Sequence, residues 1–289
     1  MTRLPITKTP KAYVGGKFIR SESGRVRALE DASGEFICNV PVCSRKDVRN
    51  AVEVAAKAGG AWAARTAYNR GQILYRLAEM MEARAEELVG AVRLTGGVTA
   101  KQAEVEVSAA IDSLVHCAGW TDKYAQVLGN TNPVSGLFFN FTVTEPMGVV
   151  CAIAPAEASL LGLILQVAPV ITSGNAIIAL ASEKNPYPAI LLGEMLATSD
   201  LPGGVVNLLS GSADELLETM TTHEHVRGLD LTVESEAAKQ AQIYAAESMK
   251  RLKVRTSKTR AQWLAEAPPS LYAIKDFIEY KTTWHPIGV

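Results

Sequence analysis

The stretch from residue 148 to residue 231 alternates short apolar runs with segments of helical spacing, and this order constrains the fold more than any other feature. The runs have the length of buried strands. Strands are expected at 148–154, 176–180, 205–209 and 226–231, and helices at 160–173, around 191–196 and at 213–220. Strand and helix in alternation predict an α/β fold whose parallel sheet is covered on both faces. Ligands of such sheets bind at the carboxyl ends of the strands.

The remainder of the chain predicts helices before this stretch and strands on either side of it. A strand pair is expected at 12–19 and a strand at 34–40. Ser44 is the expected N-cap of a helix with Asp47 three residues on, and long helices are expected at 70–94 and 98–125. Phe139, Phe141 and Val143 alternate with polar residues, which predicts a half-buried strand or hairpin arm. From Leu271 onward the tail again has the pattern of a strand.

Composition and charge exclude several classes of function. The chain has 48% hydrophobic and 20% charged residues, as ordinary globular proteins do. Its 29 basic residues nearly cancel 30 acidic ones, so no global field favours nucleic acid. The most apolar region, 147–180, is interrupted by polar residues, prolines and glycine, so no membrane span is expected. The first residues contain no apolar stretch typical of a signal peptide, which predicts a cytoplasmic protein.

The residue types that most often carry chemistry are scattered. Four cysteines, none in a CxxC pair, predict neither a zinc site nor a disulfide framework and are expected to be plain buried thiols. His223, His225 and His285 lack the spacing of metal ligands, so no metal is expected. The basic residues between Lys250 and Arg260 are typical of a solvated face or linker, although they could also dock an acidic partner.

Several segments of the chain resemble the aldehyde dehydrogenase superfamily, in the same order and spacing. They are YVGGKF, AWAARTAYNRGQILYRLAEMMEARAEEL, HCAGWTDKY, EPMGVVCAIAP, APVITSGNAIIALASEKNP, LPGGVVNLLSG and IEYKTTWHPIGV. The resemblance implies a Rossmann-like nucleotide-binding domain, a catalytic domain that holds a nucleophilic cysteine, and a bridging hairpin with a C-terminal strand that pair between subunits.

The resemblance also implies how the chain is divided, and that the catalytic domain is absent. Residues 1–135 and 148–256 correspond to the helical and Rossmann-like parts of the nucleotide-binding domain, and 136–147 to the bridging strands. Residues 257–270 form a linker where the family has its catalytic domain, and 271–289 contain the oligomerisation strand.

The positions that resemble the family's catalytic ones carry unsuitable residues. Aldehyde oxidation requires a nucleophilic thiolate, donors for the oxyanion and a carboxylate base. No cysteine lies where the family has its nucleophile. The oxyanion-binding Asn of the family corresponds to Glu157, a carboxylate that would repel a developing alkoxide. The general-base Glu corresponds to Arg255, which stays protonated. No catalytic residue is therefore assigned.

The resemblance leaves only a vestigial cofactor site, with Glu183, Gly211 and Thr232 as the candidate contacts. Glu183 matches the family's ribose-binding Glu, but Leu180 occupies the position of the ribose-binding Lys. Thr232 belongs to a pyrophosphate turn in which Val233 and Glu234 introduce bulk and like charge. No cofactor is expected to be required, and binding of NAD or NADP is expected to be weak.

Three functions remain open from the sequence. The first is a non-catalytic pseudoenzyme, a structural or regulatory subunit that assembles with itself or with an active aldehyde dehydrogenase through 136–147 and 271–289. The second is an active NAD(P)-dependent aldehyde oxidoreductase with relocated residues, which fold analogy alone supports. The third is a nucleotide-binding sensor without turnover.

Overall fold

The computed structural model describes residues 8–288 and contains one large sheet, one projecting arm and one small hairpin. The large sheet has the order β11-β10-β7-β8-β9-β1-β2. Its strands are β1 (Ala12–Val14), β2 (Lys17–Ile19), β7 (Val149–Ile153), β8 (Ala176–Leu180), β9 (Val206–Leu209), β10 (Val226–Thr232) and β11 (Arg251–Arg255). The five strands from β7 to β11 run parallel, whereas β1 and β2 add an antiparallel edge.

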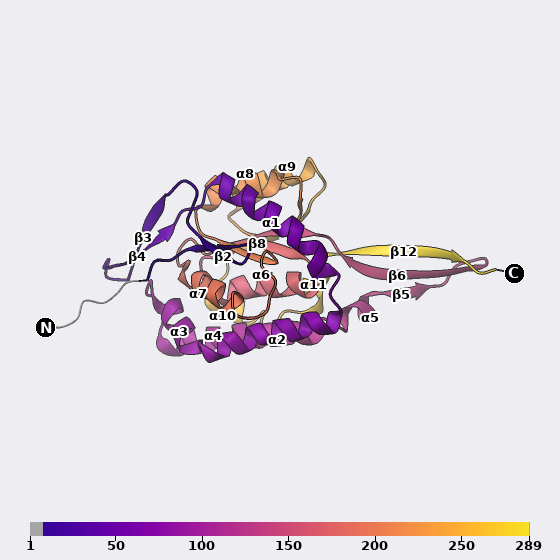
Figure 1. Cartoon of the computed structure of the whole chain (residues 1–289), viewed down its shortest axis with the longest axis horizontal. Coiled ribbons are helices and arrows are strands. Elements are labelled where there is room, and N and C mark those ends of the chain that lie inside the picture. The colour runs from indigo at the N-terminus through magenta and orange to yellow at the C-terminus, as the bar shows by residue number, and fades with distance from the viewer. Residues whose placement is uncertain (1–7, 289) are drawn as a thin grey trace.

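Helices cover both faces of this sheet, which confirms the predicted α/β class (Figure 1). One face is covered by α1 (Arg45–Ala63), α8 (Ala213–Thr222) and α9 (Ser235–Ala246). The other is covered by α6 (Leu161–Thr172) and α7 (Tyr187–Leu196), with an outer layer of α2 (Ala67–Ala83), α3 (Ala85–Arg93) and α4 (Ala100–Trp120). Every residue of β7, β8 and α6 is buried, which explains why their sequences are continuous apolar runs.

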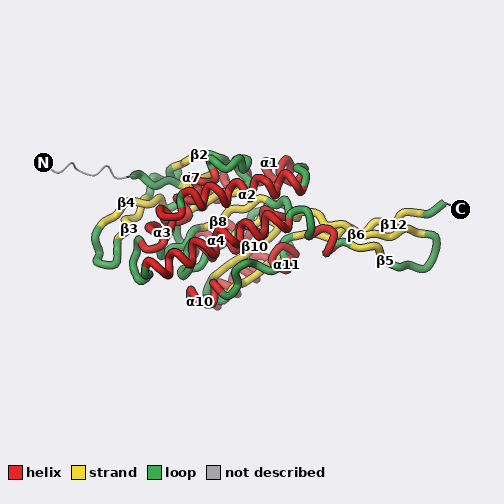
Figure 2. The backbone as a smooth tube through the Cα atoms, turned by 90° about the horizontal axis from the view of Figure 1, so that it is seen from below, coloured by secondary structure: helices red, strands yellow, loops and turns green. Residues whose placement is uncertain are grey.

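A three-stranded antiparallel arm projects from the body, as Figures 1 and 2 both show. Its order is β12-β6-β5, where β5 is Asn130–Asn132, β6 is Phe138–Pro146 and β12 is Ile278–Pro286. The short helix α5 (Tyr124–Leu128) leads into it. Residues 138–146 pair along their whole length with 278–286. The predicted bridging strand and C-terminal strand therefore lie side by side.

The structure differs from the sequence predictions at several places. The helix expected at 70–94 is two helices, because the backbone leaves helical geometry at Arg84. The hairpin partner β3 (Val26–Glu30) of β4 (Phe36–Pro41) was not predicted. The tail begins as helix α11 (Leu271–Lys275), and its strand starts only at Ile278. The segment expected to be a linker contains helix α10 (Arg260–Leu264).

No helix within residues 8–288 combines the length and the apolar character needed to cross a bilayer.

Candidate cofactor and catalytic cleft

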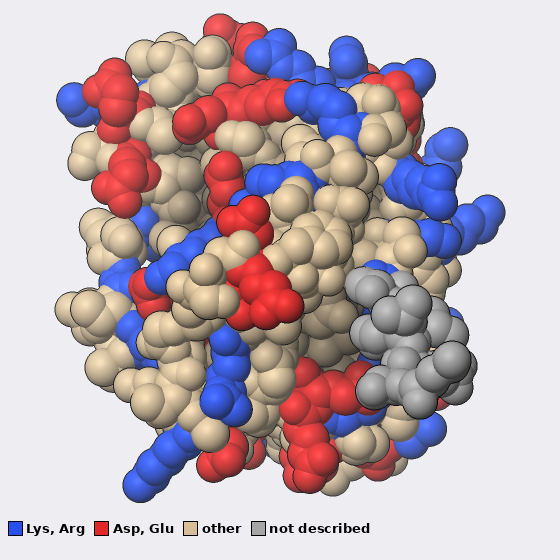
Figure 3. Space-filling view, turned by 90° about the vertical axis from the view of Figure 1, so that its left-hand side faces the viewer, with Lys and Arg blue, Asp and Glu red and all other residues tan. Residues whose placement is uncertain are grey.

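A pocket of about 220 Å³ lies at the carboxyl ends of β7, β8 and β10, where the parallel sheet predicts a ligand site. Apolar residues of these strands and of α8 and α9 make up much of its lining, among them Leu180 and Leu217. Figure 3 views the molecule from this end, on which acidic and basic side chains are interleaved. The pocket is therefore small and partly apolar, and its surroundings carry no large patch of one charge.

Two of the three predicted cofactor residues line this pocket. Glu183 and Thr232 lie on its wall, although β8 and β10 are separated by β7 in the sheet. Gly211 is outside the lining, in the turn before α8, where a side chain would lie 3.3 Å from the carbonyl oxygen of Cys43. Glu183 Oε2 accepts a hydrogen bond from the backbone N–H of Ala213 at 3.4 Å, which links the Glu183 side chain to the start of α8.

The lining does not fit the pyrophosphate of a dinucleotide. Three carboxylates, those of Glu183, Asp214 and Glu234, line the pocket, and no Lys or Arg does so. Glu234 is also the N-cap of α9 and makes no capping hydrogen bond with its side chain. A helix N-terminus attracts a phosphate only where no fixed anion occupies it. The residues of this pocket therefore do not fit NAD or NADP.

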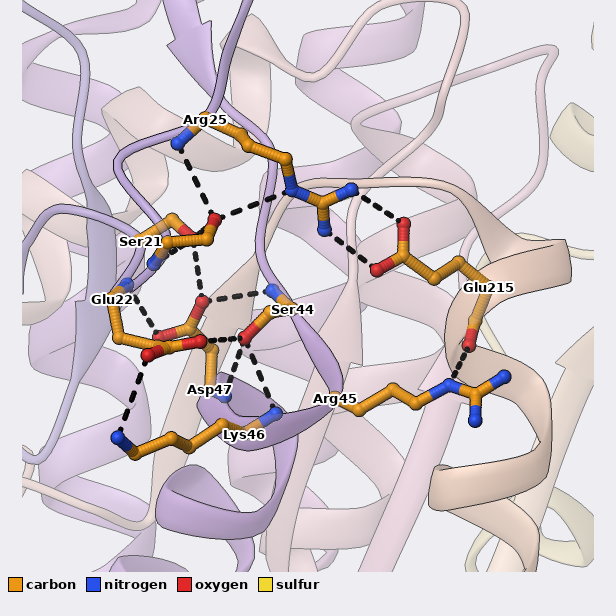
Figure 4. A network of polar contacts seen from close by, with 9 residues as sticks. Ser21, Glu22, Arg25, Ser44, Arg45, Lys46, Asp47 and Glu215 are labelled. Carbon is orange, nitrogen blue, oxygen red and sulfur yellow. Dashed lines mark hydrogen bonds and ion pairs between the residues drawn. The ribbon is translucent and has the colours of Figure 1, made fainter.

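The N-terminal segment contacts residues on the outer side of the pocket wall. Arg27 of β3 donates to the carbonyl oxygen of Glu183 at 2.7 Å. Arg25 forms two hydrogen bonds with Glu215 of α8, at 3.0 and 2.6 Å, and Figure 4 shows this pair beside the buried carboxylate of Asp47. Asp47 accepts hydrogen bonds from Ser21, Glu22 and Ser44. Ser44 and Asp47 had a sequence signal, the capping pattern, and the two arginines had none.

Glu157 lies on the turn between β7 and α6, in contact with cations rather than with a cavity. Its Oε1 accepts a hydrogen bond from Lys184 Nζ at 2.6 Å, and its Oε2 lies 3.9 Å from Arg260 Nη2. The Lys184 hydrogen bond is the main cause that holds the pKa of Glu157 below its usual value. An ionised carboxylate can only accept hydrogen bonds, so this residue cannot bind an oxyanion.

Arg255 ends β11 and is held by Asp230 of the neighbouring strand. Its Nε and Nη2 donate to the two carboxylate oxygens at 2.6 and 2.8 Å, and the side chains are only 9% and 1% exposed. Burial opposes the charge on Arg255, but the hydrogen bonds and charge of Asp230 outweigh it and raise the pKa. The position that resembles the family's base is therefore a permanently charged structural group.

None of the four cysteines has the environment of a nucleophile. All are buried, and burial raises the pKa of Cys43, Cys117 and Cys151 to about 12 each. A thiolate is the reactive form and needs a lowered pKa. Cys151 is in the centre of β7, without access to solvent.

The histidines also remain outside any site. His223 and His225 have ring centroids 5.7 Å apart beyond the end of α8. No group of three or more potential metal ligands occurs in the part of the chain that the structure describes.

The chain resembles known aldehyde dehydrogenases over most of its length. A profile of the aldehyde dehydrogenase family matches residues 18–259, and the chain belongs to that family. The putative aldehyde dehydrogenase DhaS of Bacillus subtilis is 32% identical over 248 residues, which cover 84% of this chain and 50% of that protein. Human retinal dehydrogenase 2 is 32% identical over 246 residues, which cover 83% of this chain and 47% of that protein.

Solved structures show the same partial match. The NAD+ complex of aldehyde dehydrogenase from Bacillus cereus superposes with a TM-score of 0.82 at 25% identity, over 86% of this chain and 51% of that one. The chain thus spans about half the length of the relatives it matches. Between β11 and β12 the chain has only residues 256–277, with two five-residue helices, so the implied catalytic domain is not inserted there.

Proposed function

We propose that this chain is a non-catalytic member of the aldehyde dehydrogenase family that acts as a structural or regulatory subunit, assembling through its arm with an active aldehyde dehydrogenase or with itself. One contrast carries the proposal. Glu157 and Arg255, at the positions that resemble the family's catalytic ones, are charges bound in internal ion pairs, whereas the arm exposes its apolar side chains.

The arm has the properties of an assembly surface. It is a thin sheet, and aromatic residues lie on both of its faces. Phe139 and Phe141 stack on one face with ring centroids 5.3 Å apart, and Phe138 and Trp284 make an edge contact on the other at 5.8 Å. Phe139 is 48% exposed and Trp284 is 58% exposed. Exposed apolar groups rimmed by polar ones mark interaction surfaces.

The edges of the arm support the same proposal. Within residues 8–288, β12 pairs with β6 on one side only, so its other side leaves a row of backbone groups available. A free edge strand can accept a strand from another chain. The amide nitrogen of Asn140 is buried in the arm without a hydrogen-bond partner among the described residues.

The test is to isolate the tagged chain from its native cells and to determine the mass and composition of the particle. We expect an assembly that contains either an aldehyde dehydrogenase or further copies of this chain. The double substitution Phe139→Asp and Phe141→Asp should reduce it to the monomer mass. Tyr68→Asp, on an exposed tyrosine of α2, is the matched control and should leave the assembly intact. An unchanged mass for the arm variant would contradict the proposal.

A second candidate function is nucleotide binding without turnover: Glu183 and Thr232 both lie on the pocket wall, but the three carboxylates of the lining oppose a phosphate. Titration with NAD+ and NADP+, followed by calorimetry, tests it. Saturable binding that is lost in Glu183→Ala would favour this function, and the three carboxylates of the lining predict instead that no saturation occurs below millimolar concentrations. Aldehyde-dependent reduction of either nucleotide by the purified chain would instead establish that the chain is an active oxidoreductase.

A further inference from the structure

The cap segment, defined as residues 256–277 between β11 and β12, is anchored to the body more firmly than a linker would be. Three of its large apolar side chains, those of Trp263, Ile274 and Phe277, are at most 1% exposed, whereas Tyr272 is 68% exposed. Trp263 and Phe277 belong to the same core cluster as the residues of α6. Burial of one such side chain contributes about 1.5–3 kcal/mol to the free energy of unfolding.

A buried ion pair fixes one end of the cap segment. Glu106 of α4 is fully buried, and its Oε2 accepts a hydrogen bond from Arg260 Nε at 2.7 Å. Its Oε1 accepts from the backbone N–H groups of Leu160 and Leu161, where α6 begins. One carboxylate therefore joins the cap segment to α4 and to the turn that carries Glu157.

Paired charges fix the rest of the cap segment against β11. Lys253 of β11 is paired with Asp276, and Arg255 of β11 lies 3.8 Å from Glu266. Within the segment, Glu266 also pairs with Lys258. Lys258 Nζ also lies 4.9 Å from the ring centroid of Trp263. A pocket of about 520 Å³ remains between the cap segment and β11, and each of its charged side chains already has an opposite charge within the chain.

We propose that the cap segment is a built-in seal, which closes the β11 and α6 surface within this chain so that an assembling partner meets the arm and not this face. The surface beside β11 has Trp263, Ile274 and Phe277 covered and the charges of its pocket paired. Tyr272 is the large apolar side chain that it still exposes, so it offers a second chain less to bury than the arm does. The arm, in contrast, exposes both apolar and charged side chains. Closure of this surface by the cap segment is a property of the isolated chain. Only the statement that a partner then meets the arm rests on the proposed function.

Hydrogen exchange of the full chain, read by mass spectrometry before and after assembly, tests the seal. Backbone amides of Trp263, Ala265 and Phe277 donate within the cap segment. We expect them to exchange at least about a hundredfold more slowly than unstructured amides in the isolated chain, with no further slowing on assembly. Arm peptides should slow on assembly. Free exchange of the cap segment in the isolated chain, or protection that appears only on assembly, would overturn the inference.

Two variants sharpen the test. Arg260→Ala should speed exchange in the cap segment at least about tenfold, because a buried carboxylate loses its cation. Arg76→Ala removes an exposed arginine of α2 from its pair with Glu79 and should leave the cap segment unchanged. Equal exchange in both variants would overturn the anchoring role of Arg260. A protected cap segment in a chain whose arm shows no assembly would support the seal and overturn the proposed function instead.

Discussion

Replacing Arg255 with methionine tests whether this residue is a structural cation. Methionine keeps an unbranched apolar stem and removes the guanidinium, which leaves the carboxylate of Asp230 almost fully buried. That carboxylate would then keep only a long hydrogen bond from Gln166 Nε2, at 3.5 Å to Oδ1. Two unit charges separated by about 4 Å interact by roughly 4 kcal/mol at an effective dielectric constant of 20. Removal of one partner from a buried pair typically costs about 3–5 kcal/mol.

The assay is thermal and urea unfolding followed by circular dichroism. For a chain of this size 1 kcal/mol corresponds to roughly 2 °C, so Arg255→Met should lower the midpoint by about 6–10 °C. The double variant Arg255→Met with Asp230→Asn should recover at least half of the loss, because no unpaired charge remains. Arg76→Met, in an exposed pair, should cost less than about 1 kcal/mol.

The reasoning would be refuted by a loss below about 1 kcal/mol for Arg255→Met. It would also be refuted by a double variant that is no more stable than the single one. Either result would mean that the two charges are solvated in solution, and Arg255 would then not be locked in the position that resembles the family's base.

Other predictions concern the thiols, the cap segment, the N-terminal network and acid stability. Cys151 and the other three cysteines should react with iodoacetamide at pH 8 only after unfolding, as mass spectrometry would show, and rapid stoichiometric labelling of the native protein would contradict their burial. Trp263→Ala should cost about 3–5 kcal/mol in urea unfolding, and a loss below about 1 kcal/mol would show the cap segment to be loose. Asp47→Ala should cost about 1–3 kcal/mol, because three donors lose their acceptor, and unchanged stability would mean that water replaces it. The folded pKa of Glu157 is lowered, so its pairing stabilises the protein above the unfolded pKa and this contribution is lost as pH falls through the folded pKa. Because Glu157 is 38% exposed, Lys184→Ala should remove less than about 1 kcal/mol near pH 7 and nothing at pH 2, and an equal loss at both values would contradict the pairing.

The sequence predicted the strands β7 to β10 well because each is a mostly apolar run that the structure largely buries. It gave no expectation of β11, whose five residues are all half-buried. β7 and β8 are five-residue apolar runs that are buried along their whole length, and runs of that length and composition are typical of buried parallel strands. The break at Arg84 was not predictable, because the apolar stripe of α2 continues into α3. Arg84 pairs with Glu87 and with Glu194 of α7. The contact with Glu194 joins residues far apart in the chain, so a local sequence pattern cannot predict it.

The cap segment escaped prediction for a related reason. Its helices are five residues long, too short to show a periodic pattern, and a capping pair at Thr259 and Gln262 was their only local signal. The contact that fixes it joins Arg260 to Glu106, 154 positions away. In the candidate site, too, some residues could be identified from the sequence and others only from the structure. Glu183 and Thr232 could be named from the resemblance, whereas the partners of Glu157 and Arg255 became visible only in three dimensions.

The charges at the positions that resemble catalytic ones are integrated into the fold, and this bears on whether chemistry could be restored. Glu157 interacts with Lys184 and Arg260, and Arg255 with Asp230, so each unusual charge has an opposite charge supplied by another element. Returning residue 255 alone to a carboxylate would place two acids together in a buried site, where one must take up a proton or the strands must separate. A single reversal would thus break an ion pair without completing a site. The charges of Glu157 and Arg255 are thus paired within the chain, whereas exposed aromatic side chains gather on the arm, which supports the arm as the proposed assembly surface.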